Sequence, residues 1–155
     1  MTKIEEQSSI NSGGELVVQK VESMIMGIRG ENVILDADVA ELYGVETKRI
    51  NEAVKNNPDK FPEDYMFMLT DEELQVLRST RSTSNILRSK FSTKSRALPK
   101  TFTEIGLYML ATILRSKKSI EVTFAIIETF VKVRKIKREL VDLQMKRTKT
   151  LYQIK

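Results

Sequence analysis

The chain has 155 residues, of which 41% are hydrophobic and 30% charged, a composition typical of a globular protein with a single core. It contains no cysteine and no histidine, which excludes disulfides, thiolate metal sites, cysteine nucleophiles and Ser-His-Asp hydrolases. The formal net charge is +5, and no apolar run approaches the roughly 20 residues that span a bilayer. We therefore expect a cytoplasmic protein without membrane contact.

The N-terminal part of the chain is predicted to be extended. Residues 1–14 are polar and end in two glycines, which predicts a flexible tail. Residues 15–35 alternate imperfectly between apolar and polar and carry several β-branched side chains. Gly30 separates the last two apolar runs, so this stretch predicts a β-hairpin that turns near residues 29–32.

Two short helices are predicted next. Asp36 can cap a helix over residues 37–43, and Gly44 permits the positive φ that ends a helix sharply. A second helix is predicted over residues 46–57, because Pro58 disfavours helical backbone at the residue before it.

Ala40, Gly44 and Ile50 have the spacing of a helix-turn-helix unit. Such a unit needs a small residue where the helices cross, a left-handed residue in the turn and an apolar residue between the helices. The alternative is a purely structural helical hairpin.

The second helix of this pair presents a polar outer face when Ile50 points inward. At 100° per residue, Lys48, Glu52 and Lys55 then point outward. Recognition helices touch base edges with such residues, and Asn pairs well with adenine and Arg with guanine. The residues predicted to contact bases and phosphates are Thr47, Lys48, Arg49, Asn51 and Lys55.

A strand and a capped helix are predicted after Pro58. Residues 65–69 form a short apolar and aromatic run, which favours a strand. Thr70 and Glu73 match the capping box and should open a helix that ends near Ser79.

Two further helices are predicted near the C-terminus. Residues 101–103 favour a short extended segment, and Thr103 should cap a helix that ends near residue 114. The last helix should begin near residue 118 and continue to the end of the chain.

The last helix carries two apolar stripes, which predict a wide buried face as far as Val133. The stripes are Ile120, Phe124, Ile127 and Val131, and beside them Ile126, Phe130 and Val133. Beyond Val133 only a narrow seam continues among basic residues, formed by Ile136, Leu140 and Leu143. This seam fits packing against a partner helix or self-association.

One segment has a strong positive charge. Residues 78–100 contain seven basic and no acidic residues, whereas the rest of the chain has 19 basic and 21 acidic residues and a net charge of −2. Nine Ser or Thr residues accompany them, and such hydroxyls commonly bond phosphate oxygens. The predicted phosphate contacts here are Arg78, Arg81, Arg88, Lys90, Lys94, Arg96 and Lys100. The alternative is a solvated surface loop. Phe91 is the only aromatic residue in the segment, which disfavours single-stranded nucleic acid.

Several sequence blocks in order resemble the phage-associated "ORF six N" DNA-binding domain, a relative of the KilA-N and Bro-N domains. The blocks are residues 28–36, 40–51, 61–70, 98–106 and 114–122, and the resemblance covers about residues 24–136. It implies a small α+β domain that binds DNA in phages, prophages and bacteria, often as a regulator or antirepressor. Family members often have aromatic and Gly-Arg residues where this chain has the Ser/Thr-rich run 79–95.

Together these patterns predict an α+β protein with a small β-hairpin or sheet, a helix-turn-helix-like pair and a long C-terminal helix. We expect a flexible tail over 1–14, a KilA-N-like DNA-binding domain over 15–136 and a basic helical extension over 137–155. Double-stranded DNA is the expected partner, in a transcriptional regulator or antirepressor associated with the nucleoid. The alternative is an antirepressor that binds another regulator protein without touching DNA.

We expect no catalytic residue, metal or cofactor. The clustered carboxylates lie at predicted helix starts, where the helix dipole favours anions, or in the turn after Pro62. No set of them offers the named roles of a catalytic site.

Overall fold

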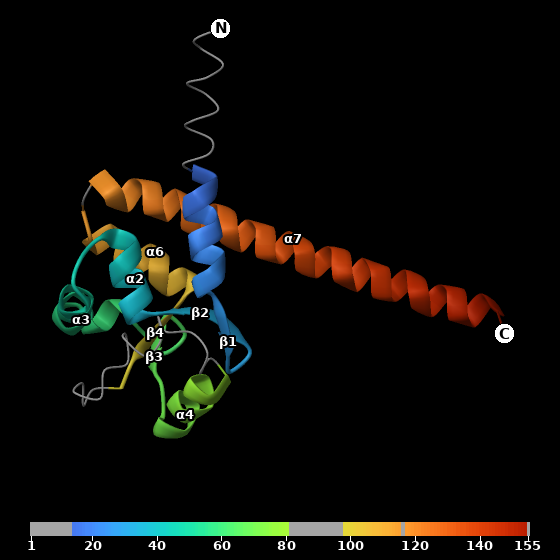
Figure 1. Ribbon diagram of the computed structural model, residues 1–155, viewed down its shortest axis with the longest axis horizontal. Helices are drawn as coiled ribbons and strands as arrows, with labels where there is room; N and C mark the ends of the chain where they lie inside the picture. Colours follow the sequence, from blue (N-terminus) through green and yellow to red (C-terminus); the bar gives the residue numbers. More distant parts are fainter. Residues whose placement is uncertain (1–13, 81–97, 116, 155) are drawn as a thin grey trace, which may run out of the picture. The chain divides into compact units, whose positions relative to one another are not determined.

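The computed structural model describes residues 14–80, 98–115 and 117–154 (Figure 1). The chain forms two compact units, one of residues 23–123 and the other of residues 1–22 with 124–155. The predicted flexible tail lies outside the described residues, except for Gly14.

The first unit contains a four-stranded antiparallel sheet with the strand order β1-β2-β4-β3. Its strands are β1 (Met26–Ile28), β2 (Glu31–Leu35), β3 (Met66–Met68) and β4 (Lys100–Thr103). The predicted extended segments at 65–69 and 101–103 are thus confirmed, and β4 joins the hairpin to β3. The α+β fold predicted from the sequence is confirmed.

The β1–β2 hairpin turns at Arg29 and Gly30, as predicted. Both residues have positive φ, 55° and 75°, which matches the two-residue turn whose twist suits antiparallel strands. Glycine adopts this conformation at no steric cost, whereas Arg29 is held in it by the side-chain contacts described below.

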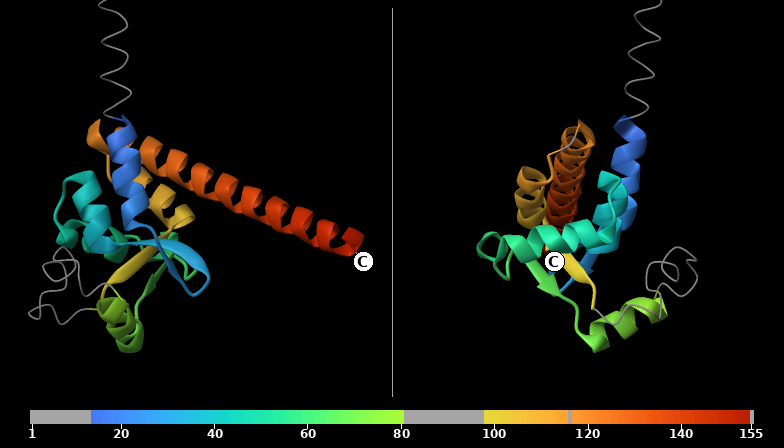
Figure 2. Two further views of the ribbon diagram at one scale, coloured as in Figure 1. Left: turned by 45° about the vertical axis from the view of Figure 1, so that its right-hand side comes forward. Right: turned by 90° about the vertical axis from the view of Figure 1, so that its left-hand side faces the viewer.

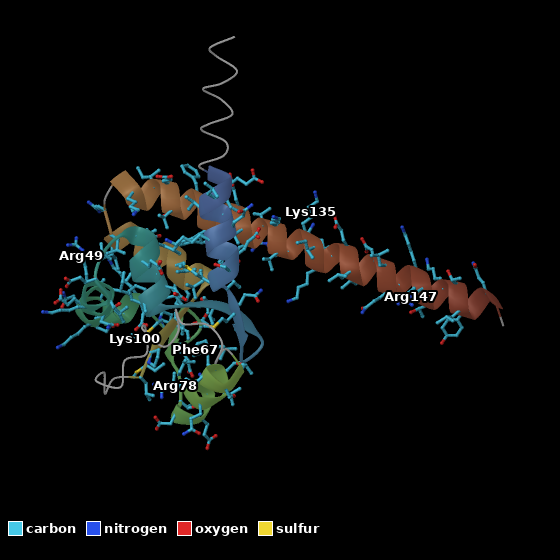
Figure 3. All side chains as sticks on the ribbon, in the orientation of Figure 1. Arg49, Phe67, Arg78, Lys100, Lys135 and Arg147 are labelled. Carbon is cyan, nitrogen blue, oxygen red and sulfur yellow. The ribbon has the colours of Figure 1, made fainter. Side chains whose placement is uncertain are left out.

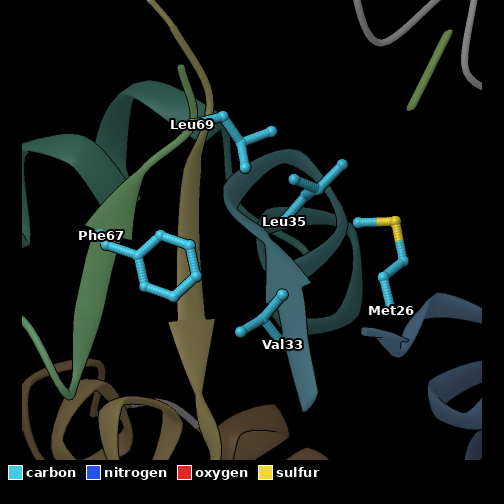
Figure 4. Close-up of a cluster of buried hydrophobic side chains, with 5 residues drawn as sticks. All are labelled: Met26, Val33, Leu35, Phe67 and Leu69. Carbon is cyan, nitrogen blue, oxygen red and sulfur yellow. The ribbon is translucent and has the colours of Figure 1, made fainter. Parts of the chain in front are cut away.

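The sheet is covered on both faces. On one face, Met26, Val33, Leu35, Phe67 and Leu69 form a buried cluster (Figure 4). Leu74 and Leu77 of α4 (Asp71–Thr80) pack against this cluster. The helices α2 (Asp36–Tyr43) and α6 (Glu104–Ile113) lie on the other side (Figures 1 and 2).

The second face of the sheet is centred on the cross-strand pair Ile34 and Phe102, neither of which has any exposed surface. The Phe61 ring meets the Phe102 ring edge-on, with the ring centroids 6.1 Å apart. Edge-to-face packing is a favoured arrangement of aromatic rings, and it ties the segment after α3 (Thr47–Asn56) to the sheet.

The extended structure expected before the hairpin is wrong for residues 14–24, which form a helix. Val17, Val21 and Met24 are spaced four and three residues apart, so they also fit one face of a helix. Val21 and Met24 are buried, and burial on that face outweighs the β propensity of the valines.

The remaining predicted helices are present. α3 is followed by the short 3-10 helix η1 (Pro58–Lys60), so Pro58 ends α3 as expected. At the start of α4, the Thr70 N–H donates to the Glu73 carboxylate and the Glu73 N–H donates to the Thr70 hydroxyl, which confirms the capping box. α6 is capped by Thr103, whose hydroxyl accepts a hydrogen bond from the Gly106 N–H.

The last helix, α7 (Lys117–Ile154), is one continuous element. The wide buried face predicted on it is wrong: Ile126 and Phe130 are buried, but Ile120 and Phe124 each keep 63% of their surface exposed. A helix that packs along one side buries one stripe, and the second apolar stripe here faces solvent. In the second unit, the Lys132 ammonium of α7 pairs with the Glu22 carboxylate at 2.7 Å, which raises the pKa of Lys132.

None of the helices in the described part of the chain is both long and apolar enough to cross a membrane.

Candidate nucleic-acid interface

A tight glycine turn joins α2 to α3. Gly44 has φ +67° and ψ +34°, and its N–H donates to the Glu41 carbonyl at 3.2 Å. The Val45 N–H reaches back to the Ala40 carbonyl at 3.0 Å. These bonds satisfy the last carbonyls of α2 with a left-handed residue, which is why glycine is suited to this position.

The two helices pack as the sequence spacing predicts. Ala40 and Ile50 are buried, with 2% and 0% of their surface exposed, and Ala53 and Val54 complete the inner face of α3. The small residue, the left-handed turn and the apolar residue thus have the predicted positions, and the helix-turn-helix interpretation of this pair stays a prediction.

The outer face of α3 is polar and mostly basic. Lys48, Arg49 and Lys55 are exposed, and Glu52 lies exposed among them. Thr47 is half-buried at the start of the helix. Figure 3 shows the Arg49 side chain at the outer edge of the molecule, on the same helix. The predicted outward face is confirmed as a surface, and its contacts remain a prediction.

Asn51 is the predicted contact residue whose surroundings differ most from expectation. It is half-buried, and its Oδ1 accepts a hydrogen bond from the Lys100 Nζ at 3.1 Å. Lys100 is the first residue of β4 and the last residue of the basic segment, 49 positions away in the chain. The structure thus brings together one residue from each of the two predicted contact regions.

A buried carboxylate holds Lys100 in place. Asp36 begins α2 and does not act as its N-cap as expected; the cap position is Leu35. The Asp36 Oδ2 accepts the Lys100 backbone N–H at 3.2 Å, and its Oδ1 accepts the Ala37 N–H at 2.8 Å. Burial raises the pKa of Asp36, and the hydrogen bonds from Lys100 and Ala37 oppose that rise. Asp36 therefore links the start of α2 to the start of β4.

A further cation lies at the glycine turn and was not predicted. A Cβ built on Gly44 would lie 3.0 Å from the Lys118 Nζ, so this ammonium sits against the turn between α2 and α3. Lys118 belongs to the resembling block 114–122, but nothing in the local sequence indicates its proximity to Gly44. The Tyr43 and Thr123 hydroxyls, 3.2 Å apart, join α2 to α7, the helix that contains Lys118.

The helix that leads into the basic segment is anchored by Arg29. Its guanidinium donates to both carboxylate oxygens of Glu73, at 2.9 and 2.8 Å, and to the Met68 carbonyl at 3.2 Å. It also lies 4.3 Å from the centre of the Phe67 ring, a cation–π contact. The guanidinium and the Thr70 N–H lower the pKa of Glu73 to about 2.

Nothing in the sequence indicated that Arg29 pairs with a distant carboxylate. Glu73, its partner, was identified only as a capping residue. The bidentate pair fixes α4 against the hairpin, so the chain enters the basic segment from a defined position.

The basic segment itself is described only at its ends. Arg78 is exposed in the last turn of α4, and Lys100 begins β4 (Figure 3). The other five predicted contacts lie outside the described residues: Arg81, Arg88, Lys90, Lys94 and Arg96.

Across residues 14–80, 98–115 and 117–154, no group of three or more His, Cys, Asp or Glu side chains is placed to hold a metal ion.

Comparison with known proteins gives one match. The ORF6N domain model matches residues 23–113, which is more than half of the chain. Comparisons with curated proteins and with solved structures gave no match. The matched residues contain the whole sheet, the α2–α3 pair and α6, so the match and the described fold coincide. The chain belongs to the ORF6N domain family.

Proposed function

We propose that the first unit binds double-stranded DNA, with α3 in the major groove, and that the protein is a binding protein and not an enzyme. The observation that carries this proposal is the outer face of α3. This face is exposed and mostly basic, the opposite side of the helix is buried, and Asn51 links the helix to Lys100 of the basic segment. Membership of the ORF6N family supports a regulatory or DNA-binding role. We propose a phage- or prophage-type transcriptional regulator or antirepressor that acts in the cytoplasm, at the nucleoid.

The contacts have different expected roles. Lys48 and Arg49 lie in the exposed first turn of α3, from which recognition helices reach base edges. Lys55, in the last turn, is suited to a phosphate contact. The residues of the basic segment, such as Arg88 and Lys94, should neutralise phosphates without reading sequence.

Asn51 should read a base through its amino group alone. An ammonium has only donors, so the amide oxygen of Asn51 must face Lys100, and Nδ2 is left to meet the DNA. A single donor can pair with guanine O6 or N7, thymine O4 or adenine N7, whereas the bidentate contact with adenine needs the oxygen as well. We therefore propose that Asn51 makes one donor contact and not the bidentate contact with adenine, so that the preference for adenine at this position is weak.

The first experiment measures binding to random-sequence duplex by fluorescence anisotropy between about 50 and 200 mM salt. A protein with 6 to 10 phosphate contacts should lose roughly 10³- to 10⁵-fold in affinity over that range. Removing a negative charge from the binding face should strengthen binding, so Glu52→Gln should tighten it for all sequences. Glu31→Gln, exposed on β2, is the matched control and should change nothing. Absence of binding at low salt would refute the proposal.

The second experiment tests base reading. Selection from randomised duplexes should yield a preferred site, and Asn51→Ala should relax it at one base pair by roughly 1–3 kcal/mol. Lys100→Met releases the Asn51 oxygen, so it should shift the preference at that pair toward adenine. Equal losses on selected and random DNA for Asn51→Ala would remove its base-reading role.

A second candidate function is interaction with a helical partner, either another regulator or a second copy. The seam of Ile136, Leu140 and Leu143 supports it, because these side chains are about half exposed and continue the stripe that holds buried Ile126. If the seam joins two copies, Leu140→Glu should convert a dimer to a monomer in sedimentation equilibrium. A wild-type protein that already sediments as a monomer would reject self-association.

A further inference from the structure

The distal part of α7 carries a concentration of positive charge that the whole-chain count conceals. Residues 132–153, here called the distal helix, contain eight basic and two acidic residues, a formal charge of +6. The basic residues are Lys132, Arg134, Lys135, Lys137, Arg138, Lys146, Arg147 and Lys149. Residues 1–77 contain seven basic and 16 acidic residues, and this net charge of −9 masks the excess in a sum over the chain.

All eight basic residues of the distal helix are exposed, and Figure 3 shows Lys135 and Arg147 projecting from it. Lys132 forms its ion pair with Glu22. The two acidic residues have basic neighbours four positions away, a spacing that brings side chains together on a helix: Lys135 precedes Glu139, and Asp142 precedes Lys146. These pairs leave a clear excess of positive charge along the helix.

Part of this charge forms a stripe on the side away from the apolar seam. At 100° per residue, Lys135, Arg138, Lys146 and Lys149 fall within an arc of about 80°, and Asp142 lies among them. The stripe runs for roughly 21 Å along the helix, at a rise of 1.5 Å per residue. It therefore offers spaced cations to an extended ligand without involving the seam.

We propose that the distal helix binds the phosphate backbone of duplex DNA, as a second contact in addition to α3. The inference rests on the proposed function and extends it, because the distal helix lies beyond the matched residues 23–113. Charge complementarity favours a polyanion over a second copy of the chain, since a second distal helix would bring another +6 charge. A basic amphipathic helix can also lie on an anionic membrane. Here the exposed apolar side chains do not form one wide face, because at 100° per residue Val141, Met145 and Tyr152 lie on another side of the helix from the seam. In addition, α3 already presents a basic face suited to DNA.

The test removes the stripe and keeps the helix. In the full-length chain, Lys135, Arg138, Lys146 and Lys149 are all changed to Gln, which has a similar helix propensity. Each lost phosphate contact should make the negative slope of log K against log salt less steep by about 0.9. We therefore expect the magnitude of the slope to fall by about 2 to 4. The charge-preserving control K135R/R138K/K146R/K149R should keep the wild-type slope. Far-UV circular dichroism checks that all the variants remain helical.

Two double variants keep the test valid if the quadruple variant does not fold. Lys135→Gln/Arg138→Gln and Lys146→Gln/Lys149→Gln should each produce about half of the decrease.

The outcomes separate this inference from the proposed function. A wild-type slope in a folded quadruple variant overturns the distal contact and leaves α3 as the binding surface. A less steep salt dependence in the quadruple variant, together with unchanged binding in Arg49→Ala and Lys48→Ala, supports the distal contact and counts against α3. Unchanged DNA binding with lost binding to phosphatidylserine vesicles would assign the stripe to a membrane and overturn the inference. Failure of the wild-type protein to bind duplex would overturn both.

Discussion

Among the glycines that the structure describes, Gly106 has the closest neighbour to a built Cβ, and Gly106→Ala tests the packing between β3 and α6. The Thr103 N–H donates to the Tyr65 carbonyl at 3.0 Å, and the Thr103 hydroxyl is shared between the Tyr65 and Asp64 carbonyls at 3.1 and 2.9 Å. These bonds hold the Tyr65 carbonyl over the first turn of α6. A Cβ on Gly106 would lie 1.9 Å from the Tyr65 oxygen and 2.8 Å from its carbonyl carbon. Either α6 or the chain at Tyr65, directly before β3, must move by more than 1 Å to relieve this overlap.

The expected loss can be estimated from these contacts. Alanine in a helix gains about 1 kcal/mol over glycine. Against this stand about 1–3 kcal/mol for overpacking and about 1 kcal/mol for each of the two hydrogen bonds to Tyr65 that the shift weakens. We expect a net loss of about 3 kcal/mol in the free energy of unfolding, or roughly 6–12 °C in Tm for a chain of this size.

The assay is urea unfolding followed by circular dichroism, with Gly27→Ala as the matched control. Gly27 lies in β1, and a Cβ there meets nothing within 4 Å. The control should stay within about 0.5 kcal/mol of the wild type, as surface substitutions usually do. If Gly106→Ala unfolds within 1 kcal/mol of Gly27→Ala, the close approach of Tyr65 does not constrain the fold and the reasoning is wrong.

Three further predictions follow from local geometry. Gly44→Ala places a Cβ at φ +67° and should cost about 1–2 kcal/mol in urea unfolding; an unchanged midpoint would show that the turn relaxes freely. The Glu73 carboxylate, with a pKa of about 2 against an ordinary 4.5, stabilises the fold fully above pH 4.5 and loses this effect as pH falls toward 2. Because its pair with Arg29 is solvent-exposed, the effect should be about 1 kcal/mol, and Glu73→Gln should remove this part of the acid dependence of unfolding. Thr101→Val removes the buried hydrogen bond from the Thr101 hydroxyl to the Phe67 carbonyl, 2.8 Å long, and should lower stability by about 1–2 kcal/mol; an equal or higher Tm would contradict it.

Local patterns in the sequence were sufficient for the features that depend on a few adjacent residues. The capping box of Thr70 and Glu73 and the cap at Thr103 were predicted correctly, because a cap involves atoms within three residues. The left-handed turn at Gly44 was predicted for the same reason. The ordered sequence blocks identified the family, since several blocks in sequence are far more specific than any one of them.

Composition determined the charge of the contact regions but not where they lie in space. The basic segment was evident from residues 78–100 alone, and the extension over 137–155 was recognised as basic. The size of the excess on the distal helix was masked in the whole-chain sum by the acidic N-terminal half of the chain, and counting charge in successive windows shows it.

Only the tertiary structure decided which residues of distant segments meet. The contact between Lys100 and Asn51 depends on the pairing of β2 with β4 and on the Asp36 carboxylate, which no local pattern encodes. The burial of one stripe of α7 and the exposure of the other likewise depend on what packs against that helix, since both stripes have helical spacing. Periodicity shows that a face is apolar, and only packing determines whether that face is covered.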